Sequence, residues 1–547
     1  MRLRYMIAVP LVAAIALPLA GRSARGDVRL NSAVQTALDL GQVIGAATAC
    51  PDIAPARIKG LTNRFTAALK EFAANKDDTA TVGGAFEQGV IFGGQSIGVR
   101  QTRCDAASRD LAGWEANTVP LMPAAPVLAA PVLAAPLLAA PPPSPVAVAP
   151  VVSSTGPAIP GPAIPGLANQ GVTAQEIRFG MAAPFSGPAK ELGRQMRLGI
   201  DTAFNSANDA GGVAGRKLRL ITADDGYEPG RTGEAMKQLY EKDLVFGFVG
   251  NVGTPTTVVA LPYAMSRRAL FFGAFTGAPL LRSDPPDRYV FNYRASYAEE
   301  TYATVHYLVK IRHLKPEQIA VFAQQDGYGD AGFEGVAAAM RSLSPNGDSG
   351  ATPRFAYQRN TDDVEAAIIQ LQQYQRLHNT AQIKAVVMVA TAKAAVKFID
   401  RSRDRVPGLV YTNVSFVGST ALAKELLALG PKVAAGVIVT QVVPPVDSYS
   451  SVVLNYKAAL EKYFPGEAPD YVSFEGYLDA NVLIEGLRRT GAQLDTEKLV
   501  TALEAMKDFD LGVGAKIGFS SGDHQALHRI WGTQLDETGH YKPILLE

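Results

Sequence analysis

The stretch from residue 244 to residue 282 most constrains the fold of this chain. It reads LVFGFVGNVGTPTTVVALPYAMSRRALFFGAFTGAPLLR, in which two short apolar runs, 244–249 and 269–274, flank a segment of helical length. Thr254 is placed to cap that helix and Pro255 to occupy its first position, where a missing N–H costs nothing. A strand, a helix and a second strand predict a parallel pair, so both turns lie at the sheet edge where open α/β folds bind ligands.

The turn at residues 254–257 has two interpretations. Its free N–H groups and the positive end of the helix dipole suit an anion such as a carboxylate. The same Thr-Pro sequence also serves as an ordinary helix cap. The local pattern leaves both interpretations open, so the rest of the chain has to decide between them.

Composition excludes several functional classes. The 547 residues carry 52 Lys and Arg against 51 Asp and Glu, so neither nucleic acid nor an anionic membrane is expected as a partner. The two cysteines are too few for a cysteine-built metal site, and the six histidines show no ligand spacing. We therefore expect no metal and no cofactor. The length predicts three or four domains.

The N-terminus has the pattern of a secretory signal peptide, which we place at residues 1–26. Arg2 and Arg4 precede an apolar segment, 6–20, that ends in small residues and is short for a membrane span. No cysteine stands near the cleavage region, which excludes a lipoprotein anchor there. A periplasmic protein without membrane insertion after cleavage is expected, and an uncleaved anchor is the alternative.

Residues 27–117 form the next predicted domain, and they contain both cysteines. In an oxidising compartment Cys50 and Cys104 are expected to pair as a disulfide. Apolar residues at helical spacing, as in 58–74, predict a small α-helical domain. Residues 118–168 are expected to be a proline- and alanine-rich linker, because repeated APVLAA and GPAIP sequences block helix and sheet and favour an extended chain.

From residue 169 to residue 547, strand-like and helical segments alternate. The predicted strands are 177–182, 218–223, 244–249, 269–274, 319–323, 385–389, 414–417 and 437–442. Strands that alternate with helices imply the α/β class, with parallel sheets covered on both faces. The pattern restarts after Arg294, which indicates two similar lobes.

Ten motifs in this segment, taken together and in order, carry a resemblance to a known family. They are PFSGPAKELG, GIDTAFNSANDAGGVAGRKLRL, DDGYEPGRT, VGNVGTPTTVVALP, GAFTGAPLLR, YVFNYRASYAEET, QQDGYGDAG, VSFVGS, VIVTQVVP and DYVSFEGY. The segment resembles the type I periplasmic binding proteins of the leucine/isoleucine/valine-binding family, the solute receptors of ABC importers. The resemblance covers none of residues 1–165.

The resemblance implies two lobes, each with a doubly wound parallel sheet, joined by three crossovers that form a hinge. The ligand lies between the lobes, and the hinge closes on binding. The implied lobe boundaries are about 172–294 with 444–514 for the first lobe and about 295–443 with 515–547 for the second. The crossovers are expected near residues 293–295, 441–444 and 512–517.

The resemblance also assigns residues to the ligand site. Thr254 matches the hydroxyl residue that binds the ligand carboxylate, and Val252 and Gly253 match residues that line the pocket. Ala274 and Thr276 match the pair that supplies a carbonyl and a hydroxyl to the ligand's ammonium and carboxylate. These roles are chemically reasonable, because a zwitterion taken out of water needs charge-assisted hydrogen bonds at both ends.

The second lobe is expected to contribute Tyr328, which matches an aromatic residue that closes over the ligand. Ser419 stands where amino-acid receptors of the family usually carry an acid for the ligand ammonium, and Thr391 stands where an aromatic residue is often found. The ligand is therefore a branched-chain or related amino acid, a carboxylate without an amine, or an amide. The remaining residues expected along the cleft are Phe185, Tyr227 and Phe275.

The leading functional hypothesis is a solute receptor that delivers a small molecule to the membrane subunits of an ABC permease. The alternative is a sensory or scaffold protein that reports ligand through the unusual N-terminal extension. An enzyme is not expected. Asp224 and Asp225 are adjacent on an extended turn and should point apart, and no G-x-S-x-G elbow is present.

Overall fold

The computed structural model describes residues 33, 36–37, 40–72, 79, 82–83, 86, 90, 104–116, 169–343, 352–378 and 381–546. The chain divides into two compact units, residues 1–157 and 158–547. The predicted signal peptide, 1–26, and the predicted proline-rich linker, 118–168, lie outside the described residues. Among the helices of the described ranges, none is both long and apolar enough to span a membrane.

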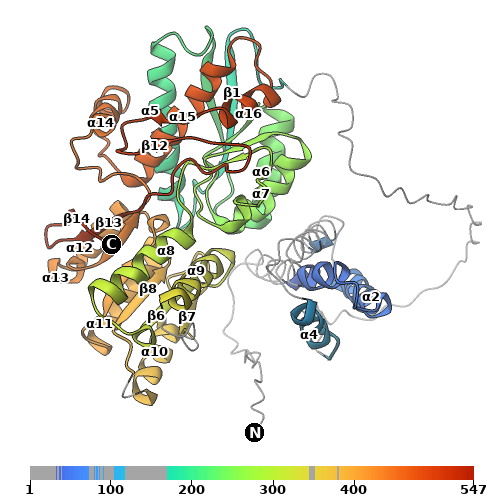
Figure 1. The fold of residues 1–547 in the computed structure, drawn as a ribbon, viewed down its shortest axis with the longest axis vertical. Helices are drawn as coiled ribbons and strands as arrows, with labels where there is room; N and C mark the ends of the chain where they lie inside the picture. The colour runs from blue at the N-terminus through green and yellow to red at the C-terminus, as the bar shows by residue number, and fades with distance from the viewer. Residues whose placement is uncertain are drawn as a thin grey trace, which may run out of the picture. The chain divides into compact units, whose positions relative to one another are not determined.

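The first unit has helices and a small core of its own. Helix α2 spans Pro55–Phe72 and α4 spans Cys104–Ala116, as Figure 1 shows. A disulfide joins Cys50 to Cys104, with the two Cα atoms 5.6 Å apart, which confirms the expected pairing. Closing a loop of 54 residues stabilises the fold by roughly 4 kcal/mol through the entropy of the unfolded chain. The core residues include Leu40, Ile44, Leu61, Phe65 and Leu111.

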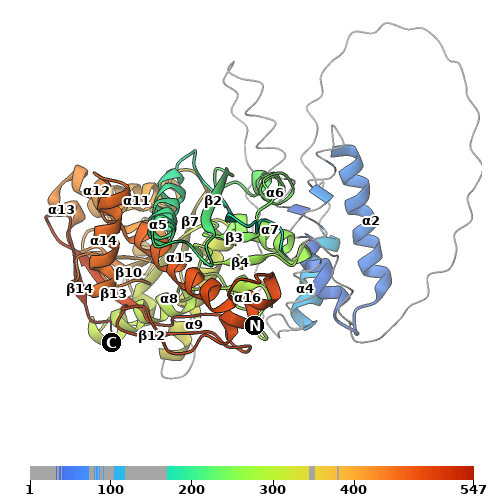
Figure 2. The ribbon, with the colours of Figure 1, turned by 90° about the horizontal axis from the view of Figure 1, so that it is seen from above.

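The first lobe of the second unit is built on a parallel sheet of five strands in the order β2-β1-β3-β4-β5. The strands are β1 Glu176–Ala183, β2 Lys217–Asp224, β3 Gly247–Val249, β4 Leu270–Phe272 and β5 Val290–Phe291. The helices are α5 Lys190–Asp209, α6 Pro229–Lys237, α7 Thr254–Ser266, α14 Ser451–Tyr463, α15 Tyr471–Thr490 and α16 Thr496–Glu504. Helices α5 and α15 lie side by side although they are far apart in sequence (Figure 1; Figure 2).

The second lobe holds a sheet of seven strands in the order β14-β13-β10-β9-β8-β6-β7. The strands are β6 Ile319–Gln324, β7 Arg354–Tyr357, β8 Ala385–Val389, β9 Val410–Asn413, β10 Ile438–Gln441, β13 Trp531–Leu535 and β14 Tyr541–Ile544. Its helices include α8 Tyr297–His306, α9 Gly327–Leu343, α10 Glu365–Leu377, α11 Ala392–Arg405, α12 Ser419–Leu429 and α13 Pro431–Ala434. Strands β13 and β14 run antiparallel, so this sheet is mixed rather than wholly parallel.

The chain passes between the lobes three times. The first passage follows β5, and the second lies between β10 and α14. The third lies between Gln525 and Trp531. Asn292 still pairs with Gln525 at the edge of the first sheet, and the chain joins the second sheet only at Trp531. The residues just before this passage therefore belong to the first lobe, where His524 stacks on Phe291 with ring centres 3.9 Å apart.

One predicted strand is wrong. Residues 414–417 are not a strand, because β9 ends at Asn413 and Ser415–Val417 forms a 3-10 turn. The Asn413 side-chain oxygen accepts a hydrogen bond of 2.9 Å from the N–H of Val414, which leads the chain out of the ladder. Gly418 then takes a left-handed φ of 76°, and Phe416 is carried to the sheet edge instead of into the sheet.

Candidate ligand-binding cleft

The start of helix α7 places two threonine hydroxyls against each other. Thr254 is the first residue of the helix and does not cap it: Gly253 holds the cap position, and no side chain bonds to the free N–H groups there. The expected capping role is therefore wrong. Thr254 Oγ1 instead lies 2.7 Å from Thr276 Oγ1, and both side chains are buried. The nearby hydroxyl of Thr257 donates back to the carbonyl of Gly253 at 2.5 Å.

Backbone pairing beyond the strand ends holds these threonines in place. The N–H of Phe275 donates to the carbonyl of Asn251 at 2.7 Å, and the N–H of Gly253 donates to the carbonyl of Phe275 at 3.2 Å. Val252 and Phe275 thus continue the parallel pairing of β3 and β4. A Cβ on Gly253 would lie 2.3 Å from the Tyr227 ring, and its φ of 105° disfavours any side chain. The glycine lets the ring reach this edge.

Aromatic rings from both lobes meet over this edge. Phe416 of the second lobe lies 5.1 Å from Phe275 of the first lobe and 4.6 Å from Tyr328, measured between ring centres. Tyr227 and Tyr297 lie 6.1 Å and 6.4 Å from Phe416. All five rings are at most 1% exposed, so the cleft is closed around them. We call these five residues the ring cluster.

Polar contacts also cross the mouth of the cleft. Arg359 of the second lobe pairs with Glu228 of the first lobe at 3.1 Å, and its other terminal nitrogen pairs with Asp326 at 3.0 Å. Asn360 donates to the carbonyl of Gly226 at 3.1 Å. Deeper inside, Gln324 donates to the Tyr227 hydroxyl at 3.1 Å. These contacts join the two lobes directly.

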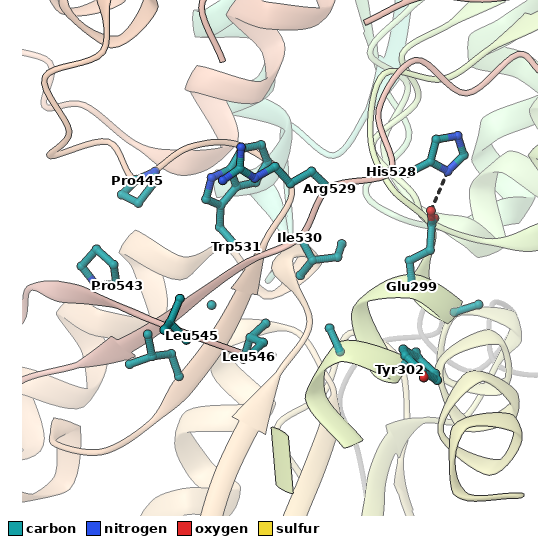
Figure 3. Close-up of a pocket in the computed structure, with 14 residues that line it drawn as sticks. Glu299, Tyr302, Pro445, His528, Arg529, Ile530, Trp531, Pro543, Leu545 and Leu546 are labelled. Carbon is teal, nitrogen blue, oxygen red and sulfur yellow. Dashed lines mark hydrogen bonds and ion pairs between the residues drawn. The ribbon is translucent and has the colours of Figure 1, made fainter. Parts of the chain in front are cut away.

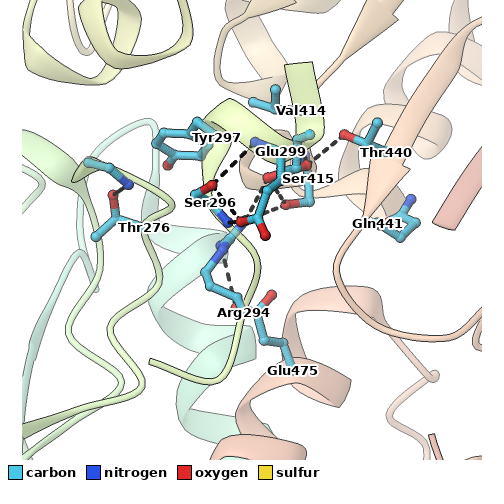
Figure 4. A network of polar contacts seen from close by, with 12 residues as sticks. Thr276, Arg294, Ser296, Tyr297, Glu299, Val414, Ser415, Thr440, Gln441 and Glu475 are labelled. Carbon is cyan, nitrogen blue, oxygen red and sulfur yellow. Dashed lines mark hydrogen bonds and ion pairs between the residues drawn. The ribbon is translucent and has the colours of Figure 1, made fainter. Parts of the chain in front are cut away.

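A buried ionic network lies where the chain first passes between the lobes (Figure 4). Arg294 is 1% exposed and forms ion pairs with Glu300 at 3.2 Å and with Glu475 of α15 at 3.4 Å. Its guanidinium also donates a hydrogen bond to the Ser415 hydroxyl. The second oxygen of Glu300 accepts from the Thr440 hydroxyl at 2.6 Å. Burial raises the pKa of Glu475 to about 7, against the opposing charge of Arg294.

Sequence reasoning did not select Arg294, Glu300 or Glu475 as functional residues. Arg294 faces the ring cluster, since its guanidinium carbon lies 4.8 Å from the centre of the Phe275 ring and 5.8 Å from that of Tyr297. The available signal was the charged sequence RASYAEE directly after an apolar strand. It does not show that these charges become buried together.

The structure brings together most of the residues that the sequence assigned to the site. Tyr227, Val252, Gly253, Thr254, Phe275, Thr276 and Tyr328 share one buried region at the carboxyl ends of β3 and β4. Thr391 belongs to an outer layer, because its N–H donates at 2.9 Å to the Tyr357 hydroxyl, which in turn bonds to Gln324 at 3.0 Å.

Two further expected residues lie apart from this region, and a third, Ala274, was expected to contribute its carbonyl. That carbonyl accepts a hydrogen bond of 2.7 Å from the N–H of Thr276, while the Ala274 side chain packs into a separate core with Phe248 and Leu261. Phe185 is partly buried beside the turn after β1, where its N–H donates to Asp224 at 2.8 Å. Ser419 is fully buried and accepts a hydrogen bond of 2.9 Å from the Gln441 side chain, and this pair lies inside the second lobe.

The adjacent carboxylates Asp224 and Asp225 serve different turns. Asp224 accepts from the Ser186 hydroxyl at 2.6 Å and pairs with Arg231 at 2.9 Å. Asp225 accepts from the N–H of Tyr227 at 2.9 Å, and burial raises its pKa to about 6. The two side chains therefore brace the turn that presents Tyr227, as two separate structural groups rather than an acid–base pair.

A hollow of about 730 Å³ lies elsewhere on the second unit (Figure 3). It is lined by Ala298, Glu299, Tyr302, Ala303, Pro445, His528, Arg529, Ile530, Trp531, Gly532, Pro543, Ile544, Leu545 and Leu546. None of the residues expected to bind ligand is among them. At one end, Glu299 pairs with His528 at 2.7 Å, next to the third passage between the lobes.

Comparison with known proteins places this architecture in a family. The model of a family described as periplasmic binding protein matches residues 176–540. The Leu/Ile/Val-binding protein BraC3 of Rhizobium johnstonii is 24% identical over 357 residues, which cover 64% of this chain and 89% of that protein. A possible leucine/isoleucine/valine-binding protein from Rhodopirellula baltica has a crystal structure that is 39% identical, with a TM-score of 0.63, covering 70% of this chain and 99% of that chain.

A substrate-binding periplasmic protein from Ralstonia solanacearum shares the fold at 24% identity and a TM-score of 0.59, covering 68% of this chain and all of that one. Two lobes and three passages of the chain between them agree with this likeness. The chain belongs to the type I periplasmic binding proteins of the leucine/isoleucine/valine-binding family.

Proposed function

We propose that this protein is an extracytoplasmic solute receptor of an ABC importer, which binds a small carboxylate-bearing molecule between its lobes and closes on it. The observation that carries the proposal is the buried pair of Thr254 and Thr276 hydroxyls, 2.7 Å apart at the N-terminus of α7. Hydroxyl donors at the positive end of a helix suit an anion. The ring cluster, which has members from both lobes, lies at the same edge and would exclude water.

Burial makes these hydrogen bonds valuable for binding. A hydrogen bond to a charged group contributes roughly 1.5–3 kcal/mol, about twice the usual amount, when it is shielded from solvent. Thr254 belongs to the first lobe, and Gly327 of the second lobe, next to Tyr328, approaches it, since a Cβ on Gly327 would lie 3.7 Å from the Thr254 methyl group. A ligand held between them would favour the closed arrangement, which is how a receptor couples binding to closure.

The names of the relatives suggest a branched-chain amino acid as the ligand. The proteins from Rhizobium johnstonii and Rhodopirellula baltica are both named for leucine, isoleucine and valine. An amine-free carboxylate is the other candidate from the sequence. By the same proposal the protein works in the periplasm after cleavage of residues 1–26 and delivers its ligand to the membrane subunits of a permease.

A second candidate is a receptor that senses the ligand instead of delivering it for uptake. One observation favours it: residues 40–116 include a helical core and a disulfide of their own, in addition to the binding unit. A permease deletion distinguishes the two functions. Loss of ligand uptake supports the importer, whereas intact uptake with a lost ligand response in a deletion of residues 27–117 supports the sensor.

The proposed site is tested by replacing Thr254 with alanine and measuring the affinity for small carboxylates by calorimetry. Loss of one hydrogen bond to a charged group should weaken binding by about 1.5–3 kcal/mol. Thr254→Ser keeps the hydroxyl and should retain most of the affinity. If Thr254→Ala lowers the free energy of unfolding but binds every carboxylate like the wild type, Thr254 has a structural role only and the proposed site is wrong.

A further inference from the structure

We propose that the cleft selects a flat carboxylate without an amino group, such as an arylalkanoate, over the corresponding amino acid. This inference rests on the proposed function and narrows its ligand. It follows from which polar groups around the ring cluster are still free to bond. Hydrogen-bond donors are free there, whereas the carboxylates that an ammonium would need are already paired.

The free donors come from both lobes. The Tyr328 hydroxyl is fully buried and has no hydrogen-bond partner among the described residues. The Arg294 guanidinium is also buried, and its Nε has no partner within the same described ranges, although the group lies over the Phe275 ring. Together with the Thr254 and Thr276 hydroxyls, the Tyr328 hydroxyl and the Arg294 Nε–H offer hydrogen-bond donors, while the Arg294 charge itself is matched by Glu300 and Glu475. A carboxylate satisfies such a set.

The carboxylates around the ring cluster are occupied. Burial is the main reason that the pKa of Tyr227 and the pKa of Tyr328 lie well above the usual range. The charge of Asp326 adds to the shift at Tyr227, and the charge of Glu300 adds to the shift at Tyr328. Asp326 pairs with Arg359 at 3.0 Å, and Glu300 pairs with Arg294 at 3.2 Å. A ligand ammonium would have to compete with a fixed guanidinium for either one.

Two other acceptors, Ser419 and Asp479, do not replace Asp326 and Glu300 as partners for a ligand ammonium. The Ser419 hydroxyl bonds to Gln441 inside the second lobe. Asp479 has one unpartnered oxygen among the described residues, but its carboxyl lies under the backbone of Gly273, and burial raises its pKa well above the usual range. An ammonium buried without a negative partner carries a large desolvation cost.

The rings indicate the shape of the ligand. Phe275 and Phe416 face each other across the lobes with their planes 30° apart, and Tyr328 lies 4.6 Å from Phe416. Faces of this kind contact a flat ring better than a branched aliphatic chain. Aromatic cages also bind quaternary ammonium groups, but the Arg294 guanidinium already lies over the Phe275 ring, at 4.8 Å from its centre.

Four compounds separate the two parts of this inference. 3-Phenylpropanoate and L-phenylalanine differ only in the amine, as do 4-methylpentanoate and L-leucine. Calorimetry with the wild-type protein should show each amine-free acid binding at least tenfold more tightly than its amino acid. 3-Phenylpropanoate should also bind at least threefold more tightly than 4-methylpentanoate.

The outcomes distinguish this inference from the proposed function. If L-leucine or L-phenylalanine binds as tightly as its amine-free partner, or if glycine betaine binds best, the inference is wrong and the receptor function stands. If none of the carboxylates binds, the carboxylate site itself is rejected, and the inference fails with it. Equal affinity for the two amine-free acids rejects the preference for a flat ligand.

Two variants test the residues named. Tyr328→Phe removes the unpartnered hydroxyl and should weaken 3-phenylpropanoate binding about tenfold. Tyr302→Phe is the control, because Tyr302 lies in the same lobe and is 42% exposed. The affinity of this variant for 3-phenylpropanoate should equal that of the wild type. Phe416→Leu should bring the two amine-free acids to similar affinity. Wild-type affinity in Tyr328→Phe, or an unchanged preference in Phe416→Leu, contradicts the assignment.

Discussion

The two walls of the cleft are built in different ways. The first lobe offers hydroxyls on loops that continue its parallel strands, so the backbone of the sheet fixes Thr254 and Thr276. The second lobe offers rings, and the turn that carries Phe416 is anchored from behind by a buried network around Arg294 and Glu300. One wall depends on local pairing and the other on charges that meet only in the folded chain.

This difference determines where each wall is vulnerable. Hydroxyls set by the backbone tolerate substitution of their neighbours, because the strand ends stay paired. Rings held by an ionic network lose their positions when one charge is removed, because the remaining charges are then buried without a partner. Substitutions in the second lobe should therefore cost more folding stability than equivalent ones in the first.

The largest effect is expected from Arg294→Met. This change leaves Glu300 and Glu475 buried without their common counter-charge. Breaking a buried pair in this way costs about 3–5 kcal/mol of folding free energy. Urea unfolding of the purified variant should show a lower midpoint with an unchanged slope.

The control for that variant is Arg489→Met, which breaks the pair of Arg489 and Glu485 on the surface of α15. Exposed pairs of this spacing contribute about 0.5 kcal/mol or less. If the two arginine variants lose the same stability, the network around Arg294 does not support the second wall, and the contrast between the lobes fails.

A smaller loss of folding stability is expected when a single ring is replaced, either Phe416 in the second wall or Phe275 in the first. Phe416 contacts four other members of the ring cluster, whereas the ring contacts of Phe275 are with Phe416 and Arg294. Phe416→Leu should therefore lower the free energy of unfolding by about 1.5 kcal/mol, and Phe275→Leu by less. Chemical unfolding of both variants measures the difference. A greater loss in Phe275→Leu would reverse the order that we assign to the walls.

Sequence patterns were sufficient for the first wall. The apolar runs that became β3 and β4 end where Thr254 and Thr276 follow, and parallel strands bring such ends to one edge. The two lobes and the parallel strands of their sheets follow from the same alternation, whereas the disulfide was expected from the oxidising compartment. Strand β8 spans the predicted residues Ala385–Val389.

The positions of the residues in the second wall could not be predicted from sequence patterns. Phe416 lies in the apolar sequence VSFV, which has the composition of a strand, but in the structure β9 ends at Asn413 and Ser415–Val417 forms a 3-10 turn. Arg294, Glu300 and Glu475 come from separate segments, so periodicity cannot reveal that they pair. The antiparallel strands β13 and β14 follow the last passage between the lobes and have no counterpart in the first sheet.

The acid stability of the second lobe should depend on Glu299. Hydrogen bonds from His528 and Ser296 outweigh burial and lower the pKa of Glu299 to about 2. A carboxyl with a lowered pKa stabilises the fold fully above its unfolded value near 4.5, and that stability is lost as the pH falls from there towards 2. Because the side chain is 30% exposed, we expect about 1 kcal/mol.

Glu299→Gln tests this dependence without losing the helix start, because glutamine also serves in a capping box with Ser296. The difference in unfolding free energy between the wild type and the variant should be largest near pH 6 and should shrink at pH 3. A difference that stays constant over this range would show that Glu299 acts through packing rather than charge.

The smallest effect is expected at the mouth of the cleft, where the walls meet through Arg359. Its ion pair with Glu228 joins the lobes directly, and both side chains are partly exposed, at 20% and 29%. Arg359→Met should therefore weaken ligand binding by only about 0.5–1 kcal/mol. The loss should be mainly in a faster dissociation rate, because under the proposed closure this pair would have to break before the lobes open. Arg267→Met, which breaks a pair within the first lobe, should leave both rates unchanged.

Stopped-flow measurements at low and high salt provide the test, since salt should reduce the effect of Arg359→Met. An altered association rate with normal dissociation would mean that Arg359 attracts the ligand instead of holding the closed lobes together.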